Sequence, residues 1–336
     1  MITTKGPRIN TKPLFILAPM DDVTDTVFRQ VISACGKPDL CFSEFVNVDG
    51  LISAGRKSLR KKLERFEEEP PLVAHIWGLN PVNFNKIAWQ LASGSLAREI
   101  GLSTNYAGID LNMGCPVRAV TKIGACSGLI KNRELAAEII AAVKDGSGGR
   151  LPVSVKTRLG FDEIDPSWTE FIFKQGVDML SIHLRTVKEM SKVPAHFEEL
   201  MRIRRQRDRL SPNTLLIANG DIKDIHQGQA IINSYNIDGV MIGRGVFTDP
   251  FAFSVNNRWA DVGTSGRITL FKKHLMLYKN WAENPDKGVK RLNKYAKIYL
   301  SGFDDAKQLR EKLSVASTVD DMLTELDTFE AGLPVM

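Results

Sequence analysis

Eight short apolar segments recur along the first 245 residues of this 336-residue chain, and stretches with helical periodicity separate them. Most are continuously apolar rather than alternating, which is typical of parallel strands covered on both faces. The segments are LFILAPM (14–20), LCFSEFV (40–46), PLVAHIWG (71–78), AGIDLNMG (107–114), LPVSVKTRLG (151–160), DMLSIHLRT (178–186), TLLIANGDI (214–222) and GVMIGRG (239–245). They begin 25 to 44 residues apart, so each interval has room for one helix.

Eight strand–helix units are the number in a (β/α)8 TIM barrel, and we predict an α/β fold of this class over residues 1–250. The clearest helical stretches are NRELAAEIIAAVKDG after the fourth segment and HFEELMRIRRQRDRL after the sixth. A doubly wound parallel sheet is the alternative fold. It is disfavoured because no G-x-G-x-x-G opens a helix after the first strand.

The pattern changes after Gly245, where a turn-rich segment connects to a region without any strand-like run. Four segments between residues 267 and 330 have the periodicity of amphipathic helices. They are ITLFKKHLMLYKNWAE, KGVKRLNKYAKIYLSG, DAKQLREKLS and TVDDMLTELDTF. We therefore predict a small all-α helical domain of three or four helices over residues 265–336.

Composition is that of a globular protein, with 43% hydrophobic and 25% charged residues. No apolar run reaches the roughly 18 residues that span a bilayer, and the N-terminal sequence has no apolar signal region. The four cysteines lack paired spacing, and the five histidines form no H-E-x-x-H motif. We expect a cytoplasmic protein without membrane contact, disulfide framework or metal site.

Charge is unevenly distributed along the C-terminal region. The segment from Arg267 to Lys297 contains nine Lys or Arg residues and two acidic residues, whereas five acidic residues and no basic residue follow Leu313. A basic block of this kind predicts a surface for a polyanion, and a merely solvated helix face is the alternative.

The fourth apolar segment ends in Asn112-Met113-Gly114-Cys115-Pro116. A thiol at the carboxyl end of a strand lies where α/β enzymes place their chemistry. Asn112 adds an amide that can donate and accept hydrogen bonds. Taken alone, a Cys after a strand is more often a buried structural residue. Together the two side chains can hold a polar planar ring and pass it a proton.

Polar residues also follow the later strands, whose ends converge on one face of a barrel. They are Lys156, Arg158, His183, Arg185, Asn219 and Asp221. A buried Lys is costly unless it meets an anion or an acceptor. The last two loops carry Gly220, Gly243, Arg244 and Gly245, which is the usual position of a barrel phosphate site. This pattern does not separate a phosphorylated substrate from a mononucleotide cofactor.

Lys156 and His183 favour a mononucleotide cofactor over a phosphorylated substrate. A cation near the N1–C2=O edge of a flavin stabilises the anionic reduced ring. The ring can lie against the backbone of Pro19 and Met20, which end the first segment. The residues therefore predict a flavin mononucleotide (FMN) barrel with Cys115 as a proton donor opposite the ring.

The chain resembles the flavin-dependent tRNA-dihydrouridine synthase family over nearly its whole length. The barrel motifs that carry the resemblance are A-P-M-x-x-V-T-D-x-x-F-R (18–29), D-L-N-M-G-C-P (110–116), V-K-T-R-L-G (155–160), I-H-x-R-T (182–186), A-N-G-D-I (218–222) and M-I-G-R-G (241–245). In the tail, K-Y-A-K-I-Y-L-S-G-F (294–303) and A-K-Q-L-R (306–310) resemble the family's helical domain.

The resemblance implies an FMN enzyme that takes reducing equivalents from NADPH and reduces uridine to 5,6-dihydrouridine in tRNA. Hydride from the reduced flavin would add to C6 of the uracil, and Cys115 would give the proton to C5. Asn112 matches the position that holds the uracil, and Arg185 is a second candidate contact. The flavin-contacting positions are Pro19, Met20, Asp21, His75, Lys156, His183, Asn219, Gly220, Asp221, Gly243 and Arg244.

Two positions depart from the family's pattern. His75 stands where the family usually has Gln, so an imidazole must make one hydrogen bond at the flavin edge. Cys126 replaces a more usual Gly and is a possible second reactive thiol.

The basic block is expected to hold the tRNA backbone, because reaching such a pocket requires the target base to leave its stack. The candidate residues are Lys290, Arg291, Lys294 and Lys297, and the arginine-rich run 202–209 is a further candidate. We expect a monomer. Which uridine is modified is not predicted.

Two other functions are compatible with parts of the sequence. A flavin barrel of the dihydroorotate dehydrogenase type, acting on a free pyrimidine, would share the Asn112–Cys115 strand end but would not need the basic tail. A non-catalytic RNA-binding barrel would not need Cys115, Lys156 and His183 together.

Overall fold

The computed structural model describes residues 13–333, which form two compact units. The first contains the described residues up to Thr26 together with Pro38–Arg244. The second contains Val27–Lys37 and the described residues from Gly245 onward. Within residues 13–333, no helix combines the length and apolar character needed to cross a membrane.

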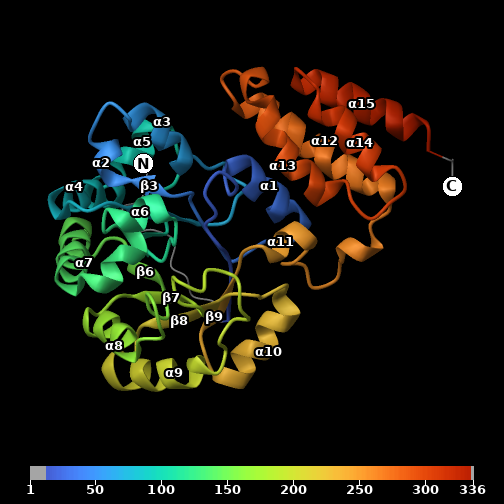
Figure 1. The fold of residues 1–336 in the computed structure, drawn as a ribbon. Coiled ribbons are helices and arrows are strands. Elements are labelled where there is room, and N and C mark those ends of the chain that lie inside the picture. Colours follow the sequence, from blue (N-terminus) through green and yellow to red (C-terminus); the bar gives the residue numbers. More distant parts are fainter. Residues whose placement is uncertain (1–12, 334–336) are drawn as a thin grey trace. The chain divides into compact units, whose positions relative to one another are not determined.

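The first unit is a closed barrel of eight parallel strands. These are β1 (Leu14–Leu17), β2 (Leu40–Phe42), β4 (Leu72–Trp77), β5 (Gly108–Met113), β6 (Val153–Arg158), β7 (Met179–His183), β8 (Leu215–Asn219) and β9 (Gly239–Ile242). Each strand pairs in parallel with the next, and β1 closes the barrel by pairing with both β2 and β9. The predicted TIM barrel is confirmed (Figure 1).

The second apolar segment of the sequence is split. Its first part is β2, and its end is the short strand β3 (Val46–Asn47), which pairs with the outer end of β4. Between them the Ser43 hydroxyl accepts a hydrogen bond from the His75 amide at 2.9 Å. The side chain thus takes the place of a backbone partner where the segment leaves the barrel wall.

Helices surround the barrel, in the order expected for strand–helix units (Figure 1). They are α2 (Val48–Leu51), α3 (Arg56–Arg60), α4 (Pro81–Ala92), α5 (Ser95–Glu99), α6 (Arg118–Lys122), α7 (Arg133–Ser147), α8 (Pro166–Lys174), α9 (Glu199–Leu210) and α10 (Ile225–Tyr235), with the 3₁₀ helices η1 (Lys61–Leu63) and η2 (Cys126–Lys131). The two helices that the sequence marked most clearly correspond to α7 and α9. Asn132 caps the N-terminus of α7, since its side chain accepts from the Leu135 amide at 3.1 Å, a common N-terminal cap.

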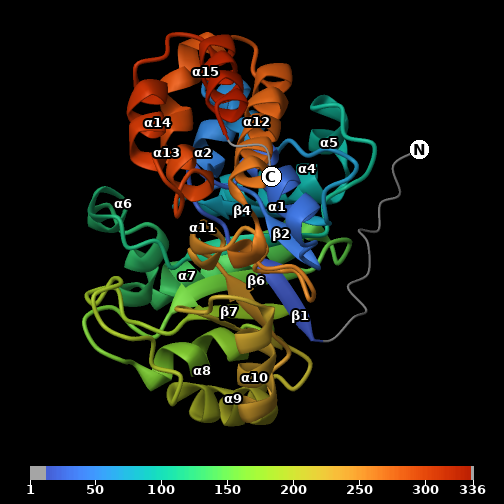
Figure 2. The same ribbon diagram turned by 90° about the vertical axis from the view of Figure 1, so that its right-hand side faces the viewer.

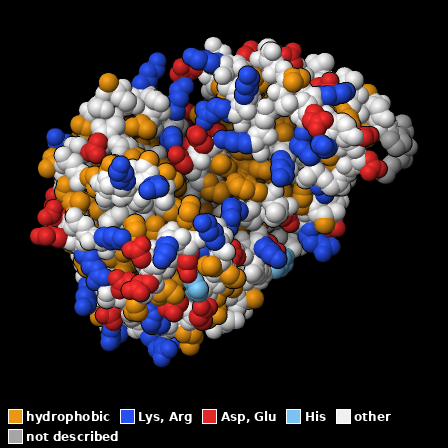
Figure 3. Space-filling view, in the orientation of Figure 1, with side chains coloured by type: hydrophobic (Ala, Val, Ile, Leu, Met, Phe, Trp, Pro, Cys, Tyr) orange, Lys and Arg blue, Asp and Glu red, His pale blue; other side chains and the backbone are white. Residues whose placement is uncertain are grey.

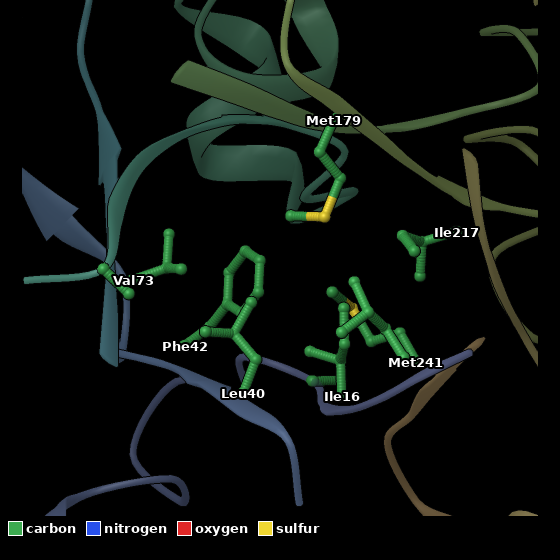
Figure 4. Packing of buried hydrophobic residues seen from close by; sticks show 10 residues of the cluster. Ile16, Leu40, Phe42, Val73, Met179, Ile217 and Met241 are labelled. Carbon is green, nitrogen blue, oxygen red and sulfur yellow. The ribbon is translucent and has the colours of Figure 1, made fainter. Parts of the chain in front are cut away.

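Apolar side chains fill the amino-terminal end of the barrel (Figure 4). The labelled members of this cluster are Ile16, Leu40, Phe42, Val73, Met179, Ile217 and Met241. Closer to the carboxyl ends, the paired positions of the strands become polar, first at His75, Asp110 and Ser154 and then at Asn112 and Lys156. The barrel interior is therefore apolar toward the amino ends of the strands and polar toward their carboxyl ends.

The second unit is helical, as predicted for the tail (Figure 2). It contains α1 (Thr26–Cys35), α11 (Gly245–Thr248), α12 (Thr264–Trp281), α13 (Val289–Tyr299), α14 (Ala306–Ser314) and α15 (Val319–Ala331), with the 3₁₀ helices η3 (Trp259–Asp261) and η4 (Asp286–Gly288). Aromatic rings form its core: Phe28 of α1 stacks on Tyr295 with centroids 5.5 Å apart. Phe271 stacks on Tyr299 at the same separation.

The acidic end of the chain neutralises part of the basic block. Lys272 of α12 lies 2.5 Å from Asp327 and 2.6 Å from Glu330 of α15, and Lys279 lies 2.6 Å from Asp320. The two charged regions that the sequence analysis treated separately are thus partners within one helical unit.

Candidate active site

Cys115 is held at the end of β5 by the side chain of Asn112. The Asn112 Oδ1 atom accepts from the amides of Gly114 at 3.1 Å and Cys115 at 3.0 Å. Gly114 has no room for a side chain, because a Cβ there would lie 3.2 Å from the Thr157 Cα. With Oδ1 engaged, the Asn112 Nδ2 is buried and has no hydrogen-bond partner among residues 13–333. Asn112 therefore offers a ligand a donor and not an acceptor.

Cys126 modifies the chemistry of Cys115. All four cysteines are buried and none forms a disulfide, and Cys126 begins η2 with a left-handed φ of 51°. The next residue, Ser127, donates from its hydroxyl to the Cys115 carbonyl at 2.7 Å, which holds the two backbone segments together. A hydrogen bond from the Cys126 thiol lowers the pKa of Cys115 to about 7, and the same bond and burial raise the pKa of Cys126.

Replacing Cys126 by Ala should raise the pKa of Cys115 toward the ordinary thiol value of about 8.5, because the donor is lost. The pH profile of Cys115 alkylation, followed by peptide mass spectrometry, measures this pKa. At pH 7 alkylation should slow about tenfold, since the thiolate fraction falls by that factor. Cys126→Ser, which keeps a donor, is the matched control and should stay near the parent profile. An unchanged profile in Cys126→Ala would show that the second thiol has no influence.

Lys156 lies beside Asn112 in the barrel register, on β6. Its Nζ donates to the Asn219 Oδ1 at 3.2 Å, and Asn219 in turn donates from Nδ2 to the Met241 carbonyl at 2.8 Å. Burial, followed by the charge of Arg158, lowers the pKa of Lys156 to about 8. Lys156 is thus a positioned cation whose charge only a neutral amide oxygen contacts directly.

His183, at the end of β7, has a buried Nδ1 to which none of the described residues forms a hydrogen bond. Burial lowers its pKa most, and the charges of Arg158, Lys156, Arg185 and Arg244 lower it further. His183 is therefore neutral, and the cations around it create a region of positive potential that favours an anionic ligand.

Arg185 and Asp221 stabilise the loop after β7. The Arg185 Nη2 pairs with the Asp221 carboxylate, and its Nε donates to the Val193 carbonyl at 2.5 Å. Asp221 has a left-handed φ of 49° and also accepts from the Ala195 amide at 3.0 Å. The third guanidinium nitrogen of Arg185, Nη1, is buried and has no hydrogen-bond partner among the described residues. One donor of Arg185 thus remains for a ligand.

The glycines predicted to border a phosphate differ in their surroundings. Gly220 has a φ of 119°, and a Cβ there would meet Ala195 at 3.2 Å. At Gly243 the nearest atom to a Cβ is the Ala18 Cβ at 3.5 Å, so space is left over this backbone. Arg244 is 61% exposed in its side chain, and its Nη2 lies 3.6 Å from the Asp221 carboxylate.

A hydrogen bond and an ion pair fix the residues that follow β1. The Met20 amide donates to the Thr24 hydroxyl at 2.9 Å, and Pro19 precedes it in a buried position. Asp21 is about half exposed and lies 2.5 Å from the Lys62 Nζ. Asp21, predicted from the resemblance to contact the flavin, therefore has its carboxylate in an ion pair with Lys62.

Two residues that support the site, Asp110 and Ser154, were not predicted to belong to it, whereas Arg158 was among the polar residues expected at the strand ends. Asp110 and Ser154 form a buried hydrogen-bonded chain with His75. Arg158 donates from Nε to the Gly114 carbonyl at 2.8 Å and from Nη1 to the Thr186 carbonyl at 3.0 Å, which ties together the loops after β5 and β7. The signal for Asp110 was its charge in an apolar run, two residues before Asn112 and hence on the same strand face.

The site as a whole fits a planar polar ring that carries a phosphate. Its free donors are the Asn112 Nδ2, the Arg185 Nη1 and, in one tautomer, the His183 Nδ1, and Lys156 adds a buried cation. Buried polar atoms normally have partners. Their clustering at the carboxyl ends of β5 to β8 therefore indicates a ligand that supplies acceptors.

The four basic residues predicted to contact tRNA lie in the helical unit. Lys290, Arg291, Lys294 and Lys297 are exposed on α13, while Leu292 and Tyr295 face the core of that unit. Positions 290, 294 and 297 are spaced so that they share one side of the helix. Among the described residues, Lys290 and Lys297 have no ion pair.

The arginine-rich run on α9 has a different environment. Arg204 pairs with Asp208 at 2.6 Å, Arg207 with Asp238 at 2.5 Å and Arg209 with Glu170 at 2.6 Å. Figure 3 shows charges of both signs interspersed over this end of the barrel, where Figure 1 places α8 and α9. Three arginines of the run are therefore paired with carboxylates, which makes the run a weaker candidate for the tRNA backbone than α13, and its role stays a prediction.

Comparison with known proteins places the chain. The family model described as dihydrouridine synthase (Dus) matches residues 16–332. This protein belongs to the dihydrouridine synthase family. A probable tRNA-dihydrouridine synthase of Staphylococcus aureus (strain COL) is 45% identical over 325 residues, which covers 96% of this chain and 94% of the relative. Probable tRNA-dihydrouridine synthase 2 of Bacillus subtilis (strain 168) is 44% identical over 322 residues, covering 95% and 94%.

Solved structures of other proteins share the fold of this dihydrouridine synthase family member, although their sequences are only 10% and 11% identical to it. A 2-naphthoyl-CoA reductase aligns with a TM-score of 0.52 and 10% identity, covering 74% of this chain and 51% of that one. Histamine dehydrogenase from Rhizobium sp. 4-9 aligns with a TM-score of 0.51 and 11% identity, covering 82% and 51%.

Proposed function

We propose that this protein reduces uridine in tRNA to 5,6-dihydrouridine, with FMN as its cofactor and NADPH as its reductant. The observation that carries the proposal is Cys115, which Asn112 holds at the end of β5 beside Lys156 of the neighbouring strand. A thiol, a free amide donor and a buried cation gathered at one barrel end match the needs of proton transfer to a polar ring. The names of the relatives support uridine in tRNA as the substrate.

The residues present fit FMN. Bound flavin would supply the hydride that adds to C6 of the uracil. Lys156 would face the pyrimidine edge of the ring, where it can balance negative charge. The backbone at Gly243 and the exposed Arg244 would hold the phosphate, because Gly243 leaves space for it and Arg244 adds charge.

The chain's own side chains would then direct the reaction on the uracil. The Asn112 Nδ2 would donate to a uracil carbonyl, the only role left to this amide once Oδ1 is engaged. Negative charge develops toward O4 as C6 accepts hydride, and Cys115 would give a proton to C5. With a pKa of about 7, Cys115 is close to the optimum for a general acid at neutral pH.

The purified protein should carry non-covalent FMN, because the Gly243–Arg244 backbone suits a single terminal phosphate. Acid release followed by chromatography identifies the flavin. Finding flavin adenine dinucleotide, or no flavin after reconstitution, would contradict the cofactor assignment.

The function is tested with tRNA from a strain that lacks the gene. Incubation with the protein and NADPH should produce dihydrouridine, measured by nucleoside mass spectrometry. Parallel reactions contain free uridine or orotate. Reduction of a free pyrimidine without any product in tRNA would overturn the proposal in favour of a dihydroorotate dehydrogenase-type activity. No product in either arm, with flavin bound and reducible by NADPH, would also overturn it.

A further inference from the structure

Three buried polar side chains form a continuous hydrogen-bonded chain across three neighbouring strands. His75 of β4, Asp110 of β5 and Ser154 of β6 occupy the same register. The His75 Nδ1 lies 2.6 Å from the Asp110 Oδ2, and the Ser154 hydroxyl donates to the Asp110 Oδ1 at 2.5 Å. The three residues are 1%, 0% and 4% exposed, so water does not compete for these bonds.

The bonds determine which nitrogen of His75 carries the proton. An ionised carboxylate has only acceptors, so the Nδ1 must donate to Asp110. Burial lowers the pKa of His75 and keeps the ring neutral, which leaves the Nε2 as a bare acceptor. The ring is also held in orientation, since its backbone amide donates to Ser43 and Phe45 packs against it with centroids 5.0 Å apart.

The free nitrogen of His75 lies next to the site. No hydrogen bond to the Nε2 is formed by the described residues, yet this atom is not among the fully enclosed polar atoms that lack a partner. It therefore keeps a small accessible surface, although His75 as a whole is 1% exposed. His75 also lies within electrostatic range of Lys156 and Asp21, the residues at the rim above it.

We propose that Asp110, held by Ser154, is a positioning residue that fixes His75 in the Nδ1–H tautomer, so that its Nε2 accepts the N3–H of the flavin. The inference rests on the proposed function, because it takes FMN as the ligand. A carboxamide at this position can turn to donate or to accept. The imidazole cannot, because its Nδ1–H is used by Asp110 and its Nε2 can only accept. A flavin edge without an N–H would therefore bind more weakly.

The first test compares two flavins on the apoprotein. FMN presents N3–H, whereas 3-methyl-FMN does not. The parent protein should bind FMN at least about tenfold more tightly, the value of one hydrogen bond with its partner left unsatisfied. In Asp110→Leu the ratio of the two affinities should fall to about twofold. The ratio is the informative quantity, because losing a carboxylate near Lys156 alters the affinity for both flavins together.

The serines of neighbouring strands provide a matched pair of variants. Ser154→Ala removes the donor that holds Asp110 and should lower the affinity ratio. Ser181 of β7 is also fully buried, but its hydroxyl has no hydrogen-bond partner in the part of the chain that the structure describes, so Ser181→Ala should keep the parent ratio. A ratio that falls equally in both variants would indicate a general packing effect and would overturn the role of Asp110.

The second test does not depend on bound flavin, and its readout is taken from the parent protein. Nitrogen NMR of ¹⁵N-histidine-labelled apoprotein distinguishes protonated from bare ring nitrogens, and His75→Gln identifies the His75 signals. We expect a protonated Nδ1 and a bare Nε2. A protonated Nε2 would overturn the inference.

Different results would overturn the cofactor assignment and the proposed role of His75. Equal affinity of the parent protein for FMN and 3-methyl-FMN would overturn the role of His75 while leaving FMN as the cofactor. Absence of any flavin binding would overturn the cofactor assignment and, with it, the proposed role of His75 and Asp110.

Discussion

Replacing Cys115 by Ala should lower the rate of dihydrouridine formation by about 10²–10⁴-fold, the usual loss for one general acid. The flavin should remain bound, because the substitution removes a thiol that hydrogen-bonds to Cys126 and changes none of the residues assigned to the flavin. Single-turnover reaction of pre-reduced enzyme with tRNA measures the step directly.

Cys41→Ala is the control for this experiment, since Cys41 is a buried residue of β2 that forms no disulfide and has no proposed role in the reaction. It should retain the parent rate. If Cys115→Ala also kept the parent rate, Cys115 would be a structural residue, and Cys126 would be the next proton donor to examine.

The same thiol sets an expected pH dependence. Only protonated Cys115 can act as the acid, so the single-turnover rate should fall as the pH rises through about 7. In Cys126→Ala the decline should move to higher pH, because the donor that stabilises the thiolate is gone.

The second large effect concerns tRNA binding. Replacing Lys290, Arg291, Lys294 and Lys297 of α13 together by Ala should weaken tRNA affinity by at least about tenfold at low salt. The slope of log K against log[salt] should also flatten by about 0.7 for each phosphate that the variant no longer neutralises, the value for single strands. Affinities measured at several salt concentrations give both quantities, and the flavin spectrum should stay unchanged.

Arg204 and Arg209 of α9 provide the matched control. Both are cations near acidic partners, Asp208 and Glu170, so replacing them by Ala should leave the salt slope near that of the parent. An unchanged slope in the α13 variant would mean that its bases are solvated and that tRNA is held elsewhere. A flattened slope in the α9 variant would restore the arginine run as a phosphate-binding surface.

The sequence by itself determined the barrel and most of the candidate site. Eight apolar runs with helical intervals determine the strand count, because burial on both faces demands such runs. Polar residues at the strand ends, such as Lys156 and His183, were identifiable because parallel strands bring their carboxyl ends to one rim. The position of Cys115 followed for the same reason.

Which side chains satisfy one another was decided only by the tertiary structure. The residue spacing along a strand tells which face a side chain occupies, but strand register decides that His75, Asp110 and Ser154 meet in one chain. Likewise, the sequence shows an arginine run on α9, whereas its neutralisation requires Glu170 and Asp238 from other elements. Hydrogen bonds and ion pairs act over a few ångströms, so their partners are set by packing between segments that are distant along the chain.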